Sequence, residues 1–143
     1  MANAFVHVEL NTTDVDKAKT FYGKLFEWTL EDVPMGAGAY TMIKVGKGTG
    51  GGMLKHPVPG APSAWLAYVE VADIAAATQK ARSLGATIMQ DVTEVMGMGW
   101  LSILIDPTGA ALGLIFMHDG RPISGEVQAG SGDEGAGGLG SQR

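Results

Sequence analysis

The sequence predicts an α+β domain in which one unit of strand, helix and three strands occurs twice and forms an open, barrel-like sheet around a cavity. Three observations point to this fold. An alternating strand followed by a capped amphipathic helix begins near Phe5, and the same pair begins again near Trp65. Short extended segments, separated by glycine and proline turns, follow each helix. The 143 residues, 45% of them hydrophobic, suit a single domain.

The first unit covers about residues 4–54. Apolar and polar residues alternate in its first strand, so one face is expected to carry Val6, Val8 and Leu10 and the other Phe5, His7, Glu9 and Asn11. Asp14 is the expected N-cap of a helix that ends near Phe26, because apolar residues then recur at three- and four-residue spacing. Three short strands are expected after the helix, at residues 28–33, 40–45 and 51–54.

The second unit covers about residues 64–117 and follows a proline-rich crossing segment. Asp73 stands between its first strand and a helix for which Gly85 is the expected C-cap. Three strands are expected at residues 87–95, 100–105 and 110–116. The two units make a predicted single domain over residues 1–118. Eight of the 22 glycines lie beyond it, so residues 119–143 are predicted to be a flexible tail.

Superposing Asp14 on Asp73 brings the first strands of the two units into the same phase. His7 then corresponds to Leu66, Glu9 to Tyr68 and Asn11 to Glu70. We therefore expect Glu9, Tyr68 and Glu70 to project to the same side as His7. These four side chains are the candidate polar groups of the cavity.

Composition excludes several classes of protein. A formal net charge of −5 disfavours binding to nucleic acid or to an anionic membrane surface. The absence of cysteine excludes thiolate metal sites and cysteine nucleophiles. No basic segment followed by an apolar run stands at the N-terminus, and no apolar stretch is long enough to span a membrane, so a cytoplasmic location is expected.

Local motifs occur in a specific order along residues 4 to 117. They are the strand sequence from His7 to Asp14, the Phe21-Tyr22 pair in the first helix, and the turn Asp106-Pro107-Thr108-Gly109 before the last strand. This combination resembles the vicinal oxygen chelate superfamily, which includes glyoxalase I, the bleomycin resistance proteins and extradiol dioxygenases, and within it a glyoxalase-like subgroup. The resemblance implies two βαβββ modules around a cavity, and a homodimer is expected.

The resemblance also implies where a divalent metal would bind, because metal-dependent members use His or Glu side chains on the first, fourth, fifth and eighth strands. His7 matches the first of these positions. Leu66 and Gly113 stand at the fifth- and eighth-strand positions, and residues 50–53 of the fourth strand offer no side-chain donor. Since a stable site needs about four to six donors, no metal or other cofactor is predicted. A shifted site for Zn, Ni, Mn or Fe would have to combine His7 with Glu9 or Glu70.

The candidate catalytic residues are His7, Glu9 and Glu70, and the candidate pocket residues are Phe5, Leu66, Tyr68, Trp100 and Gly113. Several of these residues have a structural alternative. His7 could be a hydrogen-bonded lining residue, and the two glutamates could face solvent at the mouth of the barrel. Trp65 and Trp100 could anchor a core or a dimer interface.

The sequence favours a glyoxalase- or bleomycin-resistance-like protein that binds a small organic molecule in the cavity without the usual metal. The alternative is an enzyme of the glyoxalase or dioxygenase type, with an atypical metal site or a His/Glu acid–base pair. A regulatory or assembly role for the dimer surface and the tail is a third hypothesis, with less support.

Overall fold

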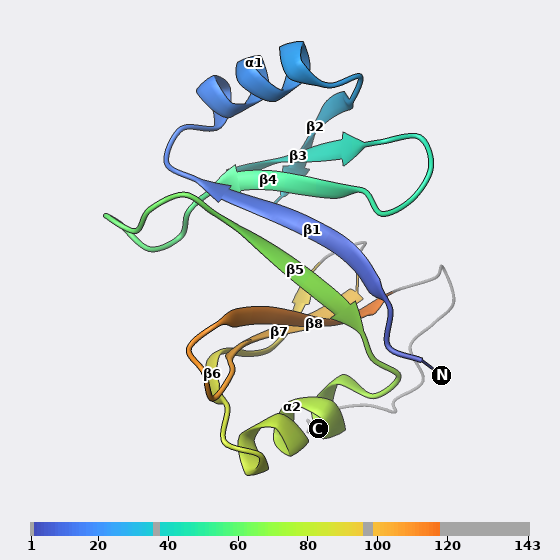
Figure 1. Ribbon diagram of the computed structural model, residues 1–143, viewed down its shortest axis with the longest axis vertical. Coiled ribbons are helices and arrows are strands. Elements are labelled where there is room, and N and C mark those ends of the chain that lie inside the picture. Colours follow the sequence, from blue (N-terminus) through green and yellow to red (C-terminus); the bar gives the residue numbers. More distant parts are fainter. Residues whose placement is uncertain (1, 36–37, 96–98, 118–143) are drawn as a thin grey trace.

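The computed structural model describes residues 2–35, 38–95 and 99–117, so the predicted tail at 119–143 lies outside the described residues. In chain order the elements are β1 (Phe5–Thr12), α1 (Val15–Leu25), β2 (Thr29–Met35), β3 (Gly38–Lys44), β4 (Gly51–Lys55), β5 (Ala64–Glu70), α2 (Ile74–Ser83), β6 (Thr87–Val95), β7 (Gly99–Ile105) and β8 (Ala111–Met117). This order, shown in Figure 1, is the predicted strand–helix–three-strand unit, twice.

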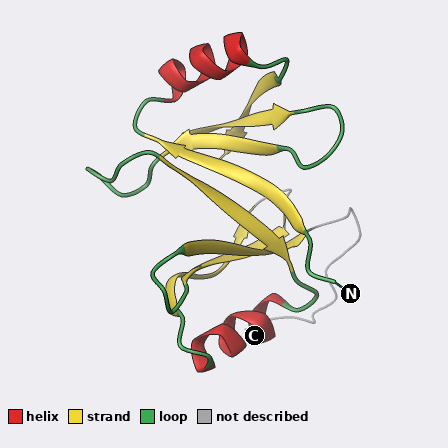
Figure 2. Cartoon of the chain, viewed as in Figure 1, coloured by secondary structure: helices red, strands yellow, loops and turns green. Residues whose placement is uncertain are grey.

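The eight strands form one mixed sheet in the order β2-β3-β4-β1-β5-β8-β7-β6. Within each module the last strand runs parallel to the first, β4 beside β1 and β8 beside β5. The modules join through the antiparallel pair of β1 and β5, so they combine within one chain. Figures 1 and 2 show α1 and α2 at opposite ends of the curved sheet. The open barrel-like α+β fold predicted from the sequence is confirmed.

Each helix covers one face of its own module. Under α1, Leu10, Ile43 and Met53 form a buried cluster that Ala18 and Tyr22 contact. Under α2, the corresponding buried cluster consists of Val71, Ile74, Leu104 and Leu114. The opposite face of the sheet, which we call the inner face, carries a third cluster of Leu66, Tyr68 and Ile115. Neither described helix is long and apolar enough to cross a membrane.

A bulge at the start of β1 overturns part of the predicted alternation. Phe5 pairs with Val69 and His7 pairs with Tyr68, so Val6 is an extra residue in β1. An inserted residue inverts the parity of every side chain before it. Val6 therefore packs on the inner-face cluster, whereas Phe5 is 61% exposed. The expectation that Phe5 shares a face with His7 was wrong for this reason.

The turn before β8 explains why the Asp-Pro-x-Gly motif stands where it does. The Asp106 carboxylate accepts hydrogen bonds from the backbone N–H of Thr108 and of Ala110, at 2.7 and 3.1 Å. Gly109 has a φ of 99°, a conformation that side chains other than glycine adopt with strain. The motif is thus a structural device that reverses the chain between β7 and β8.

Both predicted helix N-caps are present, and at the other end of α2 the C-cap is Leu84, one residue before the predicted Gly85. The Asp14 carboxylate accepts a 3.0 Å hydrogen bond from the backbone N–H of Lys17, and Asp73 does the same for Ala76. We expect Asp14→Ala to lower the free energy of unfolding by about 1 kcal/mol, because one helical N–H loses its acceptor. Urea denaturation measures this change. Asp14→Asn keeps an acceptor and should stay close to wild type, and an equal loss in both variants would contradict the capping role.

Candidate functional site

Four polar side chains meet on the inner face in one hydrogen-bonded chain. His7 and Glu9 come from β1, Tyr40 from β3 and Tyr68 from β5. The Tyr40 hydroxyl lies 2.7 Å from His7 Nε2 and donates to Glu9 Oε2 at 2.9 Å. The Tyr68 hydroxyl donates to Glu9 Oε1 at 3.1 Å. Glu9 is therefore held between two tyrosines from different modules, and we call these four residues the polar cluster.

The number of hydrogens on each group determines which group donates and which accepts in these hydrogen bonds. A tyrosine hydroxyl has one hydrogen, and that of Tyr40 is donated to Glu9. Its oxygen then accepts from His7, so Nε2 of the histidine carries a proton. The ring of His7 also packs edge-on against that of Tyr68, with centroids 5.7 Å apart. His7 therefore donates a hydrogen bond to Tyr40, and Tyr40 donates one to Glu9.

Burial displaces the titration of the whole polar cluster. It raises the pKa of Glu9, and hydrogen bonds from Tyr40, Tyr68 and Asn11 oppose this rise. Burial lowers the pKa of His7, because the charged ring loses water. Burial, followed by the negative charge of Glu9, raises the pKa of both tyrosines. The tyrosines therefore stay protonated donors, and Glu9 and His7 are the groups that titrate.

Two glycines on the inner face make room for the tyrosine rings. Gly52 of β4 is the cross-strand neighbour of Glu9, and Gly113 of β8 is that of Tyr68. A methyl group at Gly52 would overlap the outer end of the Tyr40 ring, and one at Gly113 would overlap the Tyr68 ring. The rings occupy the space that ligand side chains on β4 and β8 would fill.

The residues present do not fit the divalent metal of metal-dependent superfamily members. Within the described ranges, no group of three or more His, Cys, Asp or Glu side chains could hold a metal ion. His7 and Glu9 are two donors, and both oxygens of Glu9 already accept hydrogen bonds from tyrosines. The cross-strand neighbour of Glu9 on β5 is Leu66, which cannot bind a metal.

The structure brings some of the predicted site residues together and separates others. Leu66, Tyr68 and Gly113 lie with His7 and Glu9 on the inner face. Trp100 packs on the cluster under α2, on the other face of the sheet. Glu70 lies at the end of β5, where its backbone N–H donates to the Ala4 carbonyl, and no described side-chain hydrogen bond links it to Glu9.

Sequence reasoning missed Tyr40, which is 2% exposed and contacts both His7 and Glu9. The strand that contains Tyr40 was predicted. The alignment of the two modules selected residues only on their first strands, and Tyr40 lies on β3. A usable signal was present in Gly52, because a glycine inside a strand often marks the close approach of another group. Only the strand register shows that this group is the Tyr40 ring.

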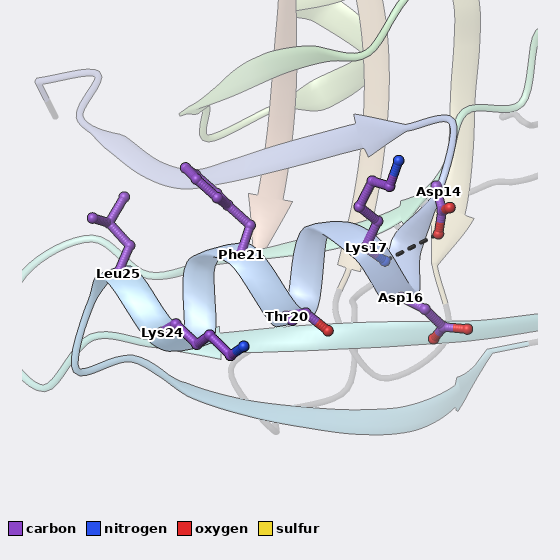
Figure 3. A pocket seen from close by; sticks show the side chains of 7 residues that line it. All are labelled: Asp14, Asp16, Lys17, Thr20, Phe21, Lys24 and Leu25. Carbon is purple, nitrogen blue, oxygen red and sulfur yellow. Dashed lines mark hydrogen bonds between the residues drawn. The ribbon is translucent and has the colours of Figure 1, made fainter.

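The described hollows lie away from the polar cluster. One, of about 890 Å³, runs along the exposed side of α1 and is lined by Asp14, Asp16, Lys17, Thr20, Phe21, Lys24 and Leu25 (Figure 3). The other, of about 280 Å³, lies beside Trp28 and Trp65 on the helix-covered face. Neither of these two hollows is lined by His7.

Comparison with protein families identifies the class. Residues 4–114 match the model of the Glyoxalase/Bleomycin resistance protein/Dioxygenase superfamily, and the chain belongs to this superfamily. Two curated relatives are the candidate glyoxylase CFP32 of Mycobacterium tuberculosis, 37% identical over 113 residues, and the anthracycline biosynthesis protein DnrV of Streptomyces peucetius, 27% identical over 118. The matches cover 75% and 72% of this chain but 43% of each relative. The chain thus spans less than half the length of these relatives.

Solved structures with the same fold have low sequence identity to this chain. Methylmalonyl-CoA epimerase from Mycobacterium tuberculosis has a TM-score of 0.62 at 14% identity, covering 80% of this chain and 87% of that one. A hypothetical protein from Bacillus halodurans has a TM-score of 0.64 at 15% identity, with 85% and 99% covered. An extradiol ring-cleaving dioxygenase from B. fuscum has a TM-score of 0.59 at 18% identity, with 79% and 32% covered. These likenesses establish the fold.

Gly52 and Gly113, which we call the glycine seats, can be tested by adding one methyl group at each. We expect Gly113→Ala to lower the free energy of unfolding by about 1–3 kcal/mol, because the base of the Tyr68 ring cannot move aside. Gly52→Ala meets the movable outer end of the Tyr40 ring and should cost less. Gly38→Ala is the matched control on β3, since nothing lies within 4 Å of its added carbon. Equal stability of all three variants in urea denaturation would contradict the claim that the tyrosine rings need glycine at positions 52 and 113.

The raised pKa of Glu9 predicts a pH-dependent stability. Because folding raises this pKa above its ordinary 4.5, the folded chain holds the proton more tightly than the unfolded chain. The resulting stabilisation is complete below the ordinary pKa and is lost as pH rises through the raised value. Gln cannot ionise, so the unfolding free energy of Glu9→Gln relative to wild type should increase as pH rises from 4.5 through the raised pKa. A difference that is constant or decreases over this interval would contradict the pKa direction.

Proposed function

We propose that this protein binds a small organic molecule at the inner face of the sheet, without the metal of metal-dependent superfamily members. The observation that carries the proposal is the polar cluster, in which a half-buried carboxylate is held by two tyrosines at the position where a metal site would be assembled. Such a cluster gives a ligand a fixed hydrogen-bonding point. Fixed polar points beside apolar side chains are typical of small-molecule sites.

The distribution of side chains on the inner face supports one ligand chemistry. Polar groups belong mainly to the first module, at His7, Glu9 and Tyr40. The second module contributes an apolar surface of Leu66, Leu101, Ile103, Ile115 and Met117. Glu9 takes part in none of the described ion pairs, so its charge is not offset by a basic side chain there. The ligand that fits is an apolar body carrying a hydrogen-bond donor or a cationic nitrogen.

The comparisons support an organic ligand in a general way. The family description includes bleomycin resistance proteins, and DnrV is named for anthracycline biosynthesis. CFP32 is named as a candidate glyoxylase. Organic molecules are the common element of these names.

A thermal-shift screen of amphipathic amines and neutral hydrogen-bond donors, followed by calorimetry of the hits, tests the proposal. We expect binding to weaken at least about tenfold in Glu9→Gln, because the ligand loses its charged acceptor. Glu94→Gln is the matched control, since it removes an exposed carboxylate of β6 outside the polar cluster. Equal loss in both variants, or no hit in a broad screen, would count against the proposal.

Elemental analysis of protein purified with and without added Zn, Ni, Mn and Fe tests the metal-free part of the proposal. We expect no stoichiometric metal, because two side-chain donors do not hold a first-row ion firmly. Stoichiometric metal that disappears in His7→Ala would overturn this part and favour a metal-dependent enzyme.

A second candidate function is acid–base catalysis of the glyoxalase type. The observation that favours it is the displacement of two linked pKa values toward each other, that of Glu9 upward and that of His7 downward. The two groups are joined through the Tyr40 hydroxyl, and a carboxyl and an imidazole linked in this way are suited to proton transfer. NMR spectra of each hit incubated with the protein distinguish the two functions, because catalysis consumes the hit and binding does not.

A homodimer and a cytoplasmic location are also part of the proposal. The homodimer is what the family resemblance implies, and the cytoplasmic location is an expectation from the sequence.

A further inference from the structure

The surface around α1, including the following Phe26 and the neighbouring Trp65 of β5, carries a group of large exposed hydrophobic residues. Phe21, Leu25, Phe26 and Trp65 are 57, 55, 44 and 43% exposed, and they make up half of the eight large exposed hydrophobic residues of the described chain. Scattered exposed residues of this kind are ordinary, but a continuous group marks an interaction site. We call these four residues the α1 patch.

Ring contacts link the three aromatic members of the α1 patch. Tyr22 lies between the exposed rings, with centroid distances of 4.9 Å to Phe21, 5.5 Å to Trp65 and 6.3 Å to Phe26. Tyr22 itself packs on the buried cluster under α1. The exposed rings are therefore fixed to the core, and a partner that binds them immobilises few new side chains.

A row of charge beside the α1 patch indicates which partner fits. Asp16, Thr20 and Lys24 are all exposed and follow one another at four-residue spacing, so they form one row along α1. Figure 3 shows this row beside Phe21 and Leu25, along the hollow on the outer side of α1. The acidic and basic ends lie about 12 Å apart at 1.5 Å per residue. None of the described ion pairs uses either end.

This row is complementary to itself. If a two-fold axis passes at Thr20, a second α1 runs antiparallel to the first, and Asp16 of each chain faces Lys24 of the other. The small Thr20 side chain lets the helices approach at the axis, while Phe21 and Leu25 cover each other's apolar surface. We propose that the α1 patch binds the α1 patch of a second copy of this chain in this antiparallel arrangement.

This inference names the surface of the homodimer in the proposed function, and it is independent of the ligand. α1 covers the face of the sheet opposite to the polar cluster. Pairing through α1 therefore leaves the inner face open. Loss of the dimer and loss of ligand binding can be observed separately.

Sedimentation equilibrium of the full chain provides the first test. We expect wild type to dimerise and the Phe21→Ser, Leu25→Ser double variant to dimerise at least about tenfold more weakly. Met89→Ser, which changes a 61% exposed residue of β6, is the matched control and should behave as wild type. Circular dichroism confirms that each variant is folded. A wild-type monomer at every concentration, or a dimer that survives the double variant, would overturn the proposal.

Charge exchange tests the antiparallel arrangement itself. Asp16→Lys places two basic groups against each other and should weaken the dimer, and Lys24→Asp should do the same with two acidic groups. Both changes in one chain restore opposite charges across the interface, so the combined variant should recover dimerisation. Failure of the combined variant to recover, while the single variants weaken the dimer, would exclude this pairing.

Discussion

The antiparallel pairing of β1 with β5 is the interaction on which the rest of this structure depends. It joins two four-stranded modules into one sheet and places Tyr68 directly across from His7. The parallel pairing of β1 with β4 brings Gly52 beside Glu9, and a methyl group at that glycine would overlap the Tyr40 ring. Every member of the polar cluster is thus positioned by backbone pairing with β1 or its neighbours. A one-residue slip of this register would send the cluster to the helix-covered face.

Once the sheet is assembled, the burial of Glu9 becomes the dominant local constraint. A half-buried carboxylate is costly unless its oxygens accept hydrogen bonds, and here each oxygen accepts one from a tyrosine. The same tyrosines depend on glycines, because a side chain at Gly52 or Gly113 would displace their rings. The polar cluster and the glycine seats therefore form one unit. In this unit the tyrosine rings fill the space into which side chains at Gly52 and Gly113 would project.

Much of the fold could be predicted because its signals are local. Alternation identified the strands, and Asp14 and Asp73 marked both helices through their capping side chains. The site was predicted less completely. His7, Glu9 and Tyr68 were found by parity along two strands, but the bulge at Val6 turned Phe5 away, and Trp100 lies on the other face of the sheet. Tyr40 has no local signal of its role, since its partner Glu9 is 31 residues away along the chain.

The sequence by itself determined the repeated module, the helix caps, the turn at Asp106 and the lack of metal ligands at Leu66 and Gly113. These features depend on residues close together in the chain or on the identity of single side chains. Only the tertiary structure decided which side chains meet, because strand register, the β1 bulge and the seating of Tyr40 over Gly52 arise when distant segments pair. The order of hydrogen bonds through Glu9 likewise exists only after β3, β1 and β5 lie in one sheet.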